Sequence, residues 1–389
     1  MVAALLRRFG AEHLARVESA VQEAGLRALE RWPGSGSATA LEGWLVRVAH
    51  NALVDELRRD RRLTPLSAAH EDAAPPPEPQ LDDELCLIFL CCHPSLPHAA
   101  QIALTLRIAF GFDTAQIARA FLSDERTIAQ RMVRAKQRLR DEGTRFELPE
   151  PSEVPSRLAP IQDVLYQLFT EGYATTADAS GIDAALCGES LRLARLLTDD
   201  ERWTSPSSEA LRALFCFHVA RTAARRADDG SLLLLHEQDR ASWDRELLDE
   251  GFEYLARSAR GDDVSRFHLE AGIAACHARA TSHATTDWGE IVALYDMLRQ
   301  ASPSPVVEVN RAFAVAMQRG ATAGLDELDA IPERELLARY PYALATYAEL
   351  HASLGHIEEA CRFLDRALAE QASPAERALL RRKRAALDS

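Results

Sequence analysis

The sequence predicts an all-α protein, with two small helical modules followed by a larger helical C-terminal part. Apolar residues recur at steps of three and four along most of the chain, which is the period of a helix with one buried face. Aromatic residues make up only 6% of the 389 residues, whereas alanine, leucine, arginine and glutamate are frequent, and this composition favours helix over strand. A chain of this length has room for two or three domains.

Two helices are expected in the first module. One covers residues 11–32 and is ended by the breaker run Trp-Pro-Gly-Ser-Gly-Ser at 32–37, and the other covers residues 39–62. The residues expected to face inward are Leu14, Val17, Val21, Ala24 and Ala28 in the first helix, and Leu45, Val48, Ala49, Ala52, Leu53 and Leu57 in the second.

Composition divides the rest of the chain. Residues 63–83 are rich in proline and acidic side chains and cannot bury a core, so a linker is expected there. A second proline-rich linker follows residue 148, and helix then follows helix with short breaks. The expected segments are a first helical module at 1–62, the acidic linker at 63–83, a second helical module at 84–148 and a helical extension at 158–389.

Two stretches of the extension have the outline of tetratricopeptide-type helix pairs. Residues 352–368 place Gly355 between two apolar helical patterns, and residues 310–328 place Gly320 in the same way. We therefore expect about two to four degenerate repeats in the extension.

Charge is distributed unevenly along the chain. The net charge is −14, but residues 1–148 are almost balanced at −1 and the remainder carries −13. Residues 119–145 hold eight basic and four acidic side chains, and residues 47–62 hold five and three. Local basic helices on a neutral region, followed by an acidic region, are typical of a DNA-binding part joined to a part that does not bind DNA.

Several classes of protein are not supported. The sequence has no apolar run long enough for a membrane span and no signal-peptide layout at its start, so we expect a cytoplasmic protein with no membrane partner. Its seven cysteines contain no Cys-x-x-Cys pair. We find no common hydrolase, zinc-protease or phosphate-loop motif and expect no enzyme activity, cofactor or metal. The groupings Cys91-Cys92-His93 with His98, and His268 with Cys276, His277 and His283, match no standard metal site.

Residues 113–140 predict a helix-turn-helix. Asp113-Thr114 can cap a short helix to Phe121, the turn Leu122–Asp124 follows, and a longer basic helix covers 125–140. In such a motif the second helix enters the major groove of DNA, where Arg and Gln read purine edges. The competing interpretation is an amphipathic surface helix with solvated arginines. The expected buried stripe of the second helix is Ile128, Met132, Ala135 and Leu139.

The helix expected at 39–62 carries a polar stripe. Its members recur at helical spacing and could follow a DNA backbone, with Asn51 available for a base contact. Basic residues near a helix C-terminus also interact favourably with the helix dipole, so the stripe alone does not decide for DNA. The stripe consists of Arg47, Asn51, Val54, Arg58 and Arg61.

Together these segments resemble the extracytoplasmic-function sigma factors of RNA polymerase. The stretch 18–24 (Glu-Ser-Ala-Val-Gln-Glu-Ala) resembles the clamp-binding helix of region 2, and 43–59 resembles the helix that engages the −10 strand. Residues 103–107, 114–120 and 129–136 resemble region 4, which reads the −35 element. The resemblance implies RNA polymerase core, through its β′ clamp and β flap, and promoter DNA as partners.

The resemblance also assigns roles to single residues. Residues 32–38 would form the pocket for an exposed −10 base. The implied polymerase-binding residues are Gln22, Glu23, Arg27 and Glu30; the implied −10 residues are Arg47, Asn51, Arg58, Arg59, Arg61 and Arg62; the implied −35 residues are Arg126, Thr127, Gln130, Arg131, Arg134, Lys136 and Arg138.

The extension resembles that of a subgroup with a tetratricopeptide-like C-terminus. The matching phrases are 165–173, 238–244 and 304–312. We expect the extension to regulate the two modules in cis or to receive a signalling protein. One cluster in it could form a groove or a latch between domains, or equally a buried network joining helices. Its members are Gln238, Asp239, Arg240, Trp243 and Asp244.

The chain departs from the family in region 2. Relatives usually begin earlier, so the first module is expected to be truncated at its start. Ser19 stands where Asp is usual and Gly25 where Phe is usual. Glycine inside a helix costs about 1 kcal/mol relative to alanine. Either the start is misassigned or polymerase binding is weak. The alternative function is a helix-turn-helix regulator that acts without polymerase and uses the repeats as a sensor, and a scaffolding repeat protein is a third possibility.

Overall fold

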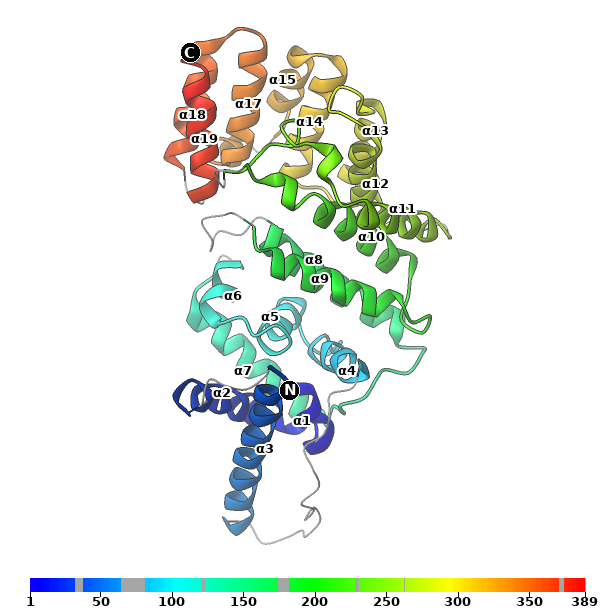
Figure 1. Ribbon diagram of the computed structural model, residues 1–389, viewed down its shortest axis with the longest axis vertical. Helices are drawn as coiled ribbons and strands as arrows, with labels where there is room; N and C mark the ends of the chain where they lie inside the picture. Colours follow the sequence, from blue (N-terminus) through cyan, green and yellow to red (C-terminus); the bar gives the residue numbers. More distant parts are fainter. Residues whose placement is uncertain are drawn as a thin grey trace. The chain divides into compact units, whose positions relative to one another are not determined.

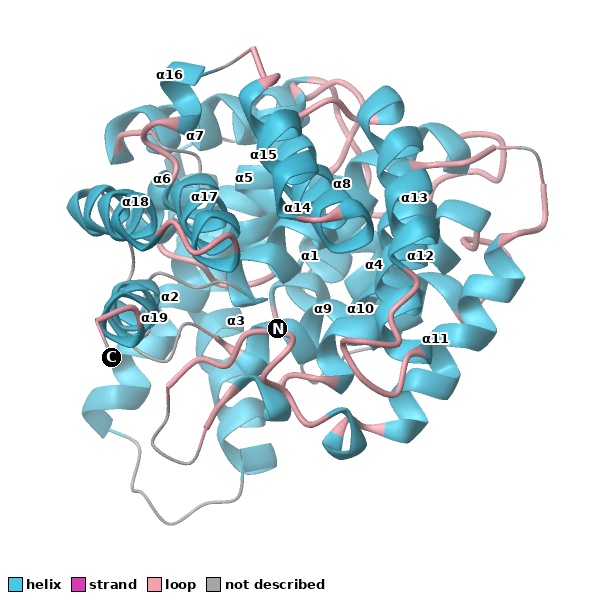
Figure 2. Cartoon of the chain, turned by 90° about the horizontal axis from the view of Figure 1, so that it is seen from above, coloured by secondary structure: helices cyan, strands magenta, loops and turns pink. Residues whose placement is uncertain are grey.

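The computed structural model describes residues 1–31, 38–63, 81–120, 123–173, 182–227, 231–261, 263–332, 334–370 and 374–388. Within these ranges the chain forms helices and no strand, as Figure 2 shows. The all-α prediction is therefore confirmed. The chain divides into two compact units, Met1–Val164 and Leu165–Ser389, and the division falls within one helix.

Among its described residues the first unit contains seven complete α-helices, one short 3-10 helix and the beginning of an eighth α-helix (Figure 1). The expected helices at 11–32, 39–62 and 125–140 all form, with small shifts at their ends. The elements are α1 (Val2–Phe9), the short η1 (Ala11–His13), α2 (Leu14–Arg31), α3 (Ala38–Leu63), α4 (Leu81–Cys91), α5 (His98–Ile108), α6 (Thr114–Ala120), α7 (Glu125–Asp141) and α8 (Val154–Tyr173).

One apolar core joins both expected modules of the first unit. Leu14 on α2 and Leu53 on α3 are almost fully buried, and they belong to the same cluster as Leu104 on α5 and Leu139 on α7. Leu5 on α1 lies in this cluster too. The two modules therefore share this cluster, because side chains before and after the expected linker bury one another.

The expected linker ends earlier than residue 83. Helix α4 begins at Leu81, and the Asp83 side chain is only 4% exposed. Arg7 on α1 donates from Nη1 to Asp83 Oδ1 at 2.9 Å. A buried carboxylate needs such a partner, so this ion pair ties α4 to α1. Residues 64–80 lie outside the described ranges.

The second unit begins in α8, and most of its described residues lie in helices. Side-chain caps start several of them: Asp183 accepts from the Leu186 N–H at 2.9 Å and Asp287 from the Glu290 N–H at 2.9 Å. The elements are α9 (Ala184–Thr198), α10 (Pro206–Ala220), η2 (Ala223–Arg225), η3 (Arg240–Ser242), α11 (Arg245–Ser258), α12 (Arg266–Arg279), α13 (Trp288–Ala301), α14 (Pro305–Arg319), α15 (Ala321–Asp329), α16 (Arg334–Leu337), α17 (Pro341–Ser353), α18 (Ile357–Ala369) and α19 (Pro374–Ala386).

Consecutive helices of the second unit pack in pairs. The pairs α10/α11, α12/α13, α14/α15 and α17/α18 each make extensive contact, and each pair also contacts a neighbouring pair. Small apolar clusters lie between them, for example around Ile291, Leu328 and Leu364. The two stretches singled out in the sequence correspond to α14/α15 and α17/α18. Gly355 lies at the α17–α18 turn with φ +77°, a conformation that favours glycine.

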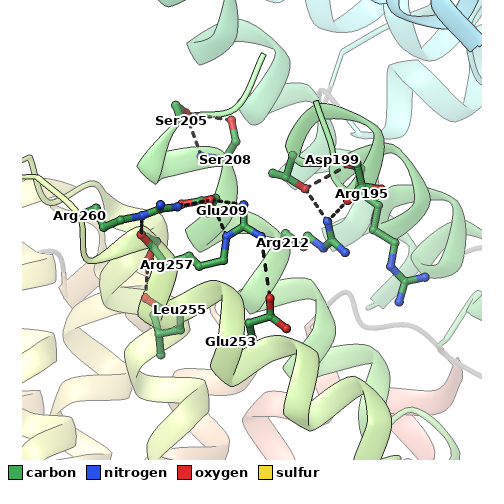
Figure 3. Close-up of polar contacts among 12 residues, drawn as sticks. Arg195, Asp199, Ser205, Ser208, Glu209, Arg212, Glu253, Leu255, Arg257 and Arg260 are labelled. Atoms are coloured by element: carbon green, nitrogen blue, oxygen red, sulfur yellow. Dashed lines mark hydrogen bonds and ion pairs between the residues drawn. The ribbon is translucent and has the colours of Figure 1, made fainter. Parts of the chain in front are cut away.

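A polar network fastens the first helices of the second unit (Figure 3). Arg212 on α10 is 7% exposed and pairs with Asp199 at 2.5 Å. It also pairs with Glu250 on α11 at 2.8 Å. Glu209, 2% exposed, accepts from Arg257 at 3.0 Å. Burial alone would raise the pKa of Glu250, but hydrogen bonds from the arginines hold it below its ordinary value. The network therefore joins α9, α10 and α11, and its two buried members, Arg212 and Glu209, both have charged partners.

Candidate nucleic-acid interface

Helices α6 and α7 form the expected helix-turn-helix. Asp113 Oδ1 accepts from the Gln116 N–H at 2.7 Å, and Gln116 Oε1 accepts from the Asp113 N–H at 2.8 Å, which is a reciprocal cap for α6. Asp124 accepts from the Thr127 N–H and hydroxyl, both at 2.8 Å, and so begins α7. These hydrogen bonds, the one from the Thr127 N–H first, lower the pKa of Asp124. Phe121, expected at the end of the first helix, and Leu122, expected in the turn, lie outside the described residues.

Helix α7 has one buried and one basic face. The expected stripe of Ile128, Met132, Ala135 and Leu139 is buried, so the helix lies in the orientation that the sequence predicted. The opposite side presents cations and hydrogen-bonding groups near the N-terminal half, which is the part that reaches base edges in this motif. The exposed members of the expected −35 set are Arg126, Thr127, Gln130, Arg134 and Arg138.

Two members of the −35 set are not exposed. Arg131 and Lys136 are half-buried. The Lys136 ammonium donates to Glu18 on α2, and Arg107 on α5 donates from Nε to the other oxygen of the same carboxylate at 2.7 Å. The structure therefore places Lys136 beside α2, the helix that carries the expected polymerase-binding residues, and not on the exposed basic face of α7.

Helix α3 presents the second basic face. Val46, Ala49 and Leu53 are buried, which leaves the opposite side of the helix exposed. The expected −10 residues Arg47, Asn51, Arg58 and Arg59 are exposed there. The side chains of Arg61 and Arg62, and residues 32–37 of the expected base pocket at 32–38, lie outside the described residues.

Helix α2 presents the expected polymerase-binding residues. Gln22, Glu23, Arg27 and Glu30 are all exposed. Glu23 and Arg27 pair along the helix at 2.5 Å. The inner face of α2 is formed by other residues, so this set is free to meet a partner.

Sequence reasoning missed two leucines on the same helix. Leu26 is 64% exposed and Leu29 is 87% exposed. They lie four and seven residues after Gln22, so the three share one side of α2. A signal was available, because neither leucine falls on the apolar stripe that runs from Leu14 to Ala28. Exposed leucines beside charged residues are typical of a protein-binding surface.

The expected cluster in the extension separates into distinct parts. Gln238, Arg240 and Trp243 are buried, whereas Asp239 and Asp244 are exposed. The two aspartates are helix caps, accepting from Ala241 N at 2.9 Å and Leu247 N at 3.1 Å.

Arg240 connects η3 to the end of α12 and to the loop that follows α12. It donates to the carbonyl oxygens of His277 at 2.8 Å and Ala280 at 2.9 Å, and to Thr286 Oγ1 at 3.2 Å. Of the interpretations left open, this arginine fits the buried network that joins helices.

Other chemistry finds little support in the described part of the chain. It contains no group of three His, Cys, Asp or Glu side chains placed to hold a metal ion. Burial raises the pKa of the Cys92 thiol to about 12, and that of Cys91 well above its ordinary value, so both remain protonated. No described helix combines the length and apolar character that crossing a membrane requires.

Comparison with known proteins covers most of the chain. Residues 1–63 match the family model described as "Sigma-70 region 2", and residues 86–139 match "Sigma-70, region 4". Residues 157–259 match "Family of unknown function (DUF6596)". An uncharacterized protein of Rhizobium meliloti (strain 1021) is 37% identical to this chain over 398 residues, which cover 97% of this chain and 91% of the relative. No solved structure matches the chain.

Proposed function

Because the chain belongs to the sigma-70 family and carries an extra C-terminal domain, we propose that it is an extracytoplasmic-function sigma factor that directs RNA polymerase core to specific promoters. A role in promoter recognition follows from the two sigma-70 regions, and it makes the chain a transcription factor rather than an enzyme. Its partners are core polymerase and promoter DNA. Such a protein acts where the DNA is, in the cytoplasm.

Recognition of the −35 element would fall to α7. Arg126, Gln130 and Arg134 are exposed at helical spacing over a buried stripe, so they would enter the major groove together. Arg138, one turn further along, would hold a phosphate. This exposed basic face on a capped second helix is the observation that carries the proposal.

Recognition of the −10 element would fall to α3. Arg47, Arg58 and Arg59 would contact the strand's phosphates, and Asn51 would contact a base. No covalent chemistry is needed, because promoter opening exchanges base stacking for contacts in the protein.

Docking on polymerase would use the exposed side of α2. Leu26 and Leu29 supply apolar area, and Gln22, Glu23 and Arg27 supply polar contacts around it. We assign this surface to the β′ clamp and assign the β flap to the second module.

The first unit would have to open for both modules to act. Elements centred at −10 and −35 lie about 25 base pairs apart, which is about 85 Å of duplex at 3.4 Å per base pair. Here α2 and α7 touch through Glu18 and Lys136. Gln22 donates to the same Glu18 carboxylate at 3.3 Å. Polymerase binding at Gln22 would therefore compete directly with the contacts that hold α2 against α5 and α7.

We assign regulation to the extension. Its helices pack in successive pairs, which supports the tetratricopeptide-like architecture that we propose for it. Stacks of that kind present concave surfaces to partners. The extension would act on the sigma modules in cis or receive a signalling protein.

In vitro transcription with core polymerase tests the proposal. The full chain should direct initiation at a defined start site, and Arg126→Ala with Arg134→Ala should abolish it while polymerase binding persists. Arg245→Ala is the matched control, because Arg245 is exposed at the start of α11 in the second unit. Specific DNA binding without polymerase, together with no initiation, would instead establish a helix-turn-helix regulator.

A further inference from the structure

The second unit encloses a cavity that the promoter function does not use. It has a volume of about 480 Å³, within the range that holds small organic ligands. Helices α10, α12, α13 and α14 supply most of its wall. The segment between α10 and α11 adds five residues, and α8, α17 and the loop before α13 add one each. The three phrases by which the extension resembles its subgroup all reach it, through Tyr166, Trp243 and Asn310.

Most of the cavity wall is aromatic or aliphatic. The rings of Trp288 and Phe313 meet edge to face at 6.1 Å, and His283 lies 5.1 Å from the same tryptophan. Such a wall favours a flat, largely apolar body. The aromatic residues that line it are Tyr166, Phe217, Trp243, Trp288, Tyr295 and Phe313.

Three lining residues hold buried polar atoms without a hydrogen-bond partner in the described part of the chain. They are His218 Nδ1, His277 Nδ1 and Trp243 Nε1. Trp243 is 4% exposed, and its indole N–H can only donate. Buried polar atoms are nearly always satisfied, so unpaired ones on a cavity wall point to a missing acceptor.

The same part of the wall is surrounded by cations. Burial lowers the pKa of His277 to about 3, and Arg221, Arg240 and His283 add to the effect. Burial likewise lowers the pKa of His218 well below 6.5, followed by the effects of Arg221 and Arg225. Burial, the larger cause, disfavours a charge of either sign, whereas the nearby arginines disfavour a further positive charge and favour a negative one.

Arg221 is the cation with most freedom to bind a ligand. It lines the cavity, and its guanidinium lies 5.5 Å from the Tyr173 ring. Among the described residues no ion pair is recorded for it, whereas the lining carboxylate Glu349 is paired with Lys383 at 2.6 Å. The other lining carboxylate, Glu270, has its pKa raised by burial, which favours the uncharged form.

We propose that this cavity binds a small organic anion with an aromatic body, whose acidic group meets Arg221, His218 and Trp243. The aromatic body lies against Trp288 and Phe313. The extension then carries a ligand-sensing site, and this inference is independent of promoter recognition because binding is measured without polymerase or DNA.

Two dyes with the same ring system test the proposal on the full chain. 1-Anilinonaphthalene-8-sulfonate is an aromatic anion, and N-phenyl-1-naphthylamine lacks its sulfonate. The anionic dye should bind one equivalent per chain, with fluorescence energy transfer from tryptophan, and at least about tenfold more tightly than the neutral dye.

Variants locate the site and the charge. Arg221→Ala should weaken the anionic dye about tenfold and leave the neutral dye within about twofold. Ala274→Trp, which fills the cavity from α12, should abolish binding of both dyes, and Arg245→Ala should change neither. Near-ultraviolet circular dichroism must show each variant folded.

Three results would overturn the proposal: no binding of either dye, equal affinity for both, or anionic-dye binding that Arg221→Ala leaves unchanged. The Arg221 result does not depend on the cavity-filling variant, so a failure of Ala274→Trp to fold leaves the test intact.

Discussion

Glu18 on α2 accepts a hydrogen bond from Arg107 on α5 at 2.7 Å, although 89 residues separate the two in sequence. The same carboxylate holds Lys136 on α7. The Glu18 side chain is only 14% exposed, so the contact is screened less than a surface ion pair. One acidic residue thus fastens the polymerase-type helix to two helices of the second module.

Disrupting this contact should loosen the first unit. We expect Glu18→Gln to lower the free energy of unfolding by about 1–3 kcal/mol, because two partly buried cations lose their counter-charge. A urea titration of Glu18→Gln, Lys136→Met and the double variant measures the coupling, expected at about 0.5–3 kcal/mol. Strict additivity of the two single changes would contradict the contact.

The exposed leucines of α2 should matter for polymerase and not for folding. Leu26→Ser with Leu29→Ser should weaken binding to core polymerase about tenfold or more, since apolar anchors dominate protein interfaces. The melting temperature should stay constant, because both side chains are already in water. Leu354→Ser, at an exposed leucine of the second unit, is the control. Unchanged binding would remove α2 from the polymerase interface.

Glycine substitutions should have opposite effects in the two units. A Cβ added at Gly25 on α2 meets nothing within 4 Å, so Gly25→Ala should stabilise the chain by up to about 1 kcal/mol. At Gly324 on α15 a Cβ would collide with the Ala316 side chain and lie 3.0 Å from the Ala312 carbonyl oxygen. Gly324→Ala should therefore cost about 1–3 kcal/mol. Thermal unfolding of both variants checks the signs, and stabilisation by the second would show that α14 and α15 pack less closely.

The buried arginine of α10 should be critical for the second unit. Arg212→Leu removes the buried cation that Asp199 and Glu250 share, although Glu250 keeps Arg195, and we expect a loss of about 1–3 kcal/mol in urea unfolding. Arg192→Leu removes an exposed pair with Glu189 and should cost under about 1 kcal/mol. Similar losses for the two variants would argue against the network in Figure 3.

Acid should destabilise the second unit through His277. Its folded pKa of about 3 lies below the ordinary 6.5, so the unfolded chain binds more protons between these values. The stability that the second unit gains from keeping His277 neutral is therefore fully present above about pH 6.5 and is lost as the pH falls toward 3.

For one histidine the loss from pH 7.5 to 5.0 is up to about 2 kcal/mol. Urea unfolding at the two pH values measures it, and His277→Gln should reduce the difference while His236→Gln, at an exposed site, should not. The buried His218 has the same sign and would retain part of the effect. An unchanged pH dependence in His277→Gln would contradict the prediction.

Sequence periodicity was sufficient for the local architecture. The buried stripe of α7 and the caps at Asp113 and Asp124 were predictable, because each depends on residues within a few turns. The roles expected for α2 in polymerase binding and for α3 and α7 in DNA binding came from the family resemblance. The matches to the two sigma-70 regions support that resemblance.

Long-range pairing was not predictable in the same way. The sequence predicted that Asp83 belongs to the linker, because its partner Arg7 lies 76 residues away and local composition does not indicate their contact. The sequence predicted Lys136 to contact DNA, because its ion-pair partner Glu18 lies 118 residues away and no local pattern indicates that pairing. The cavity likewise needs side chains from many elements, and no local pattern indicates that Trp243 and Trp288 line the same cavity.

The pairing of Glu18 with two cations also affects how strongly DNA binding by this protein depends on salt concentration. Each DNA phosphate that a protein cation neutralises releases condensed counterions, and the salt slope of binding counts these contacts. While Lys136 is paired with Glu18, its ammonium group neutralises no DNA phosphate and therefore releases no counterions from the DNA. Opening of the first unit would steepen the salt slope of promoter binding by about one unit, even with the same bases contacted.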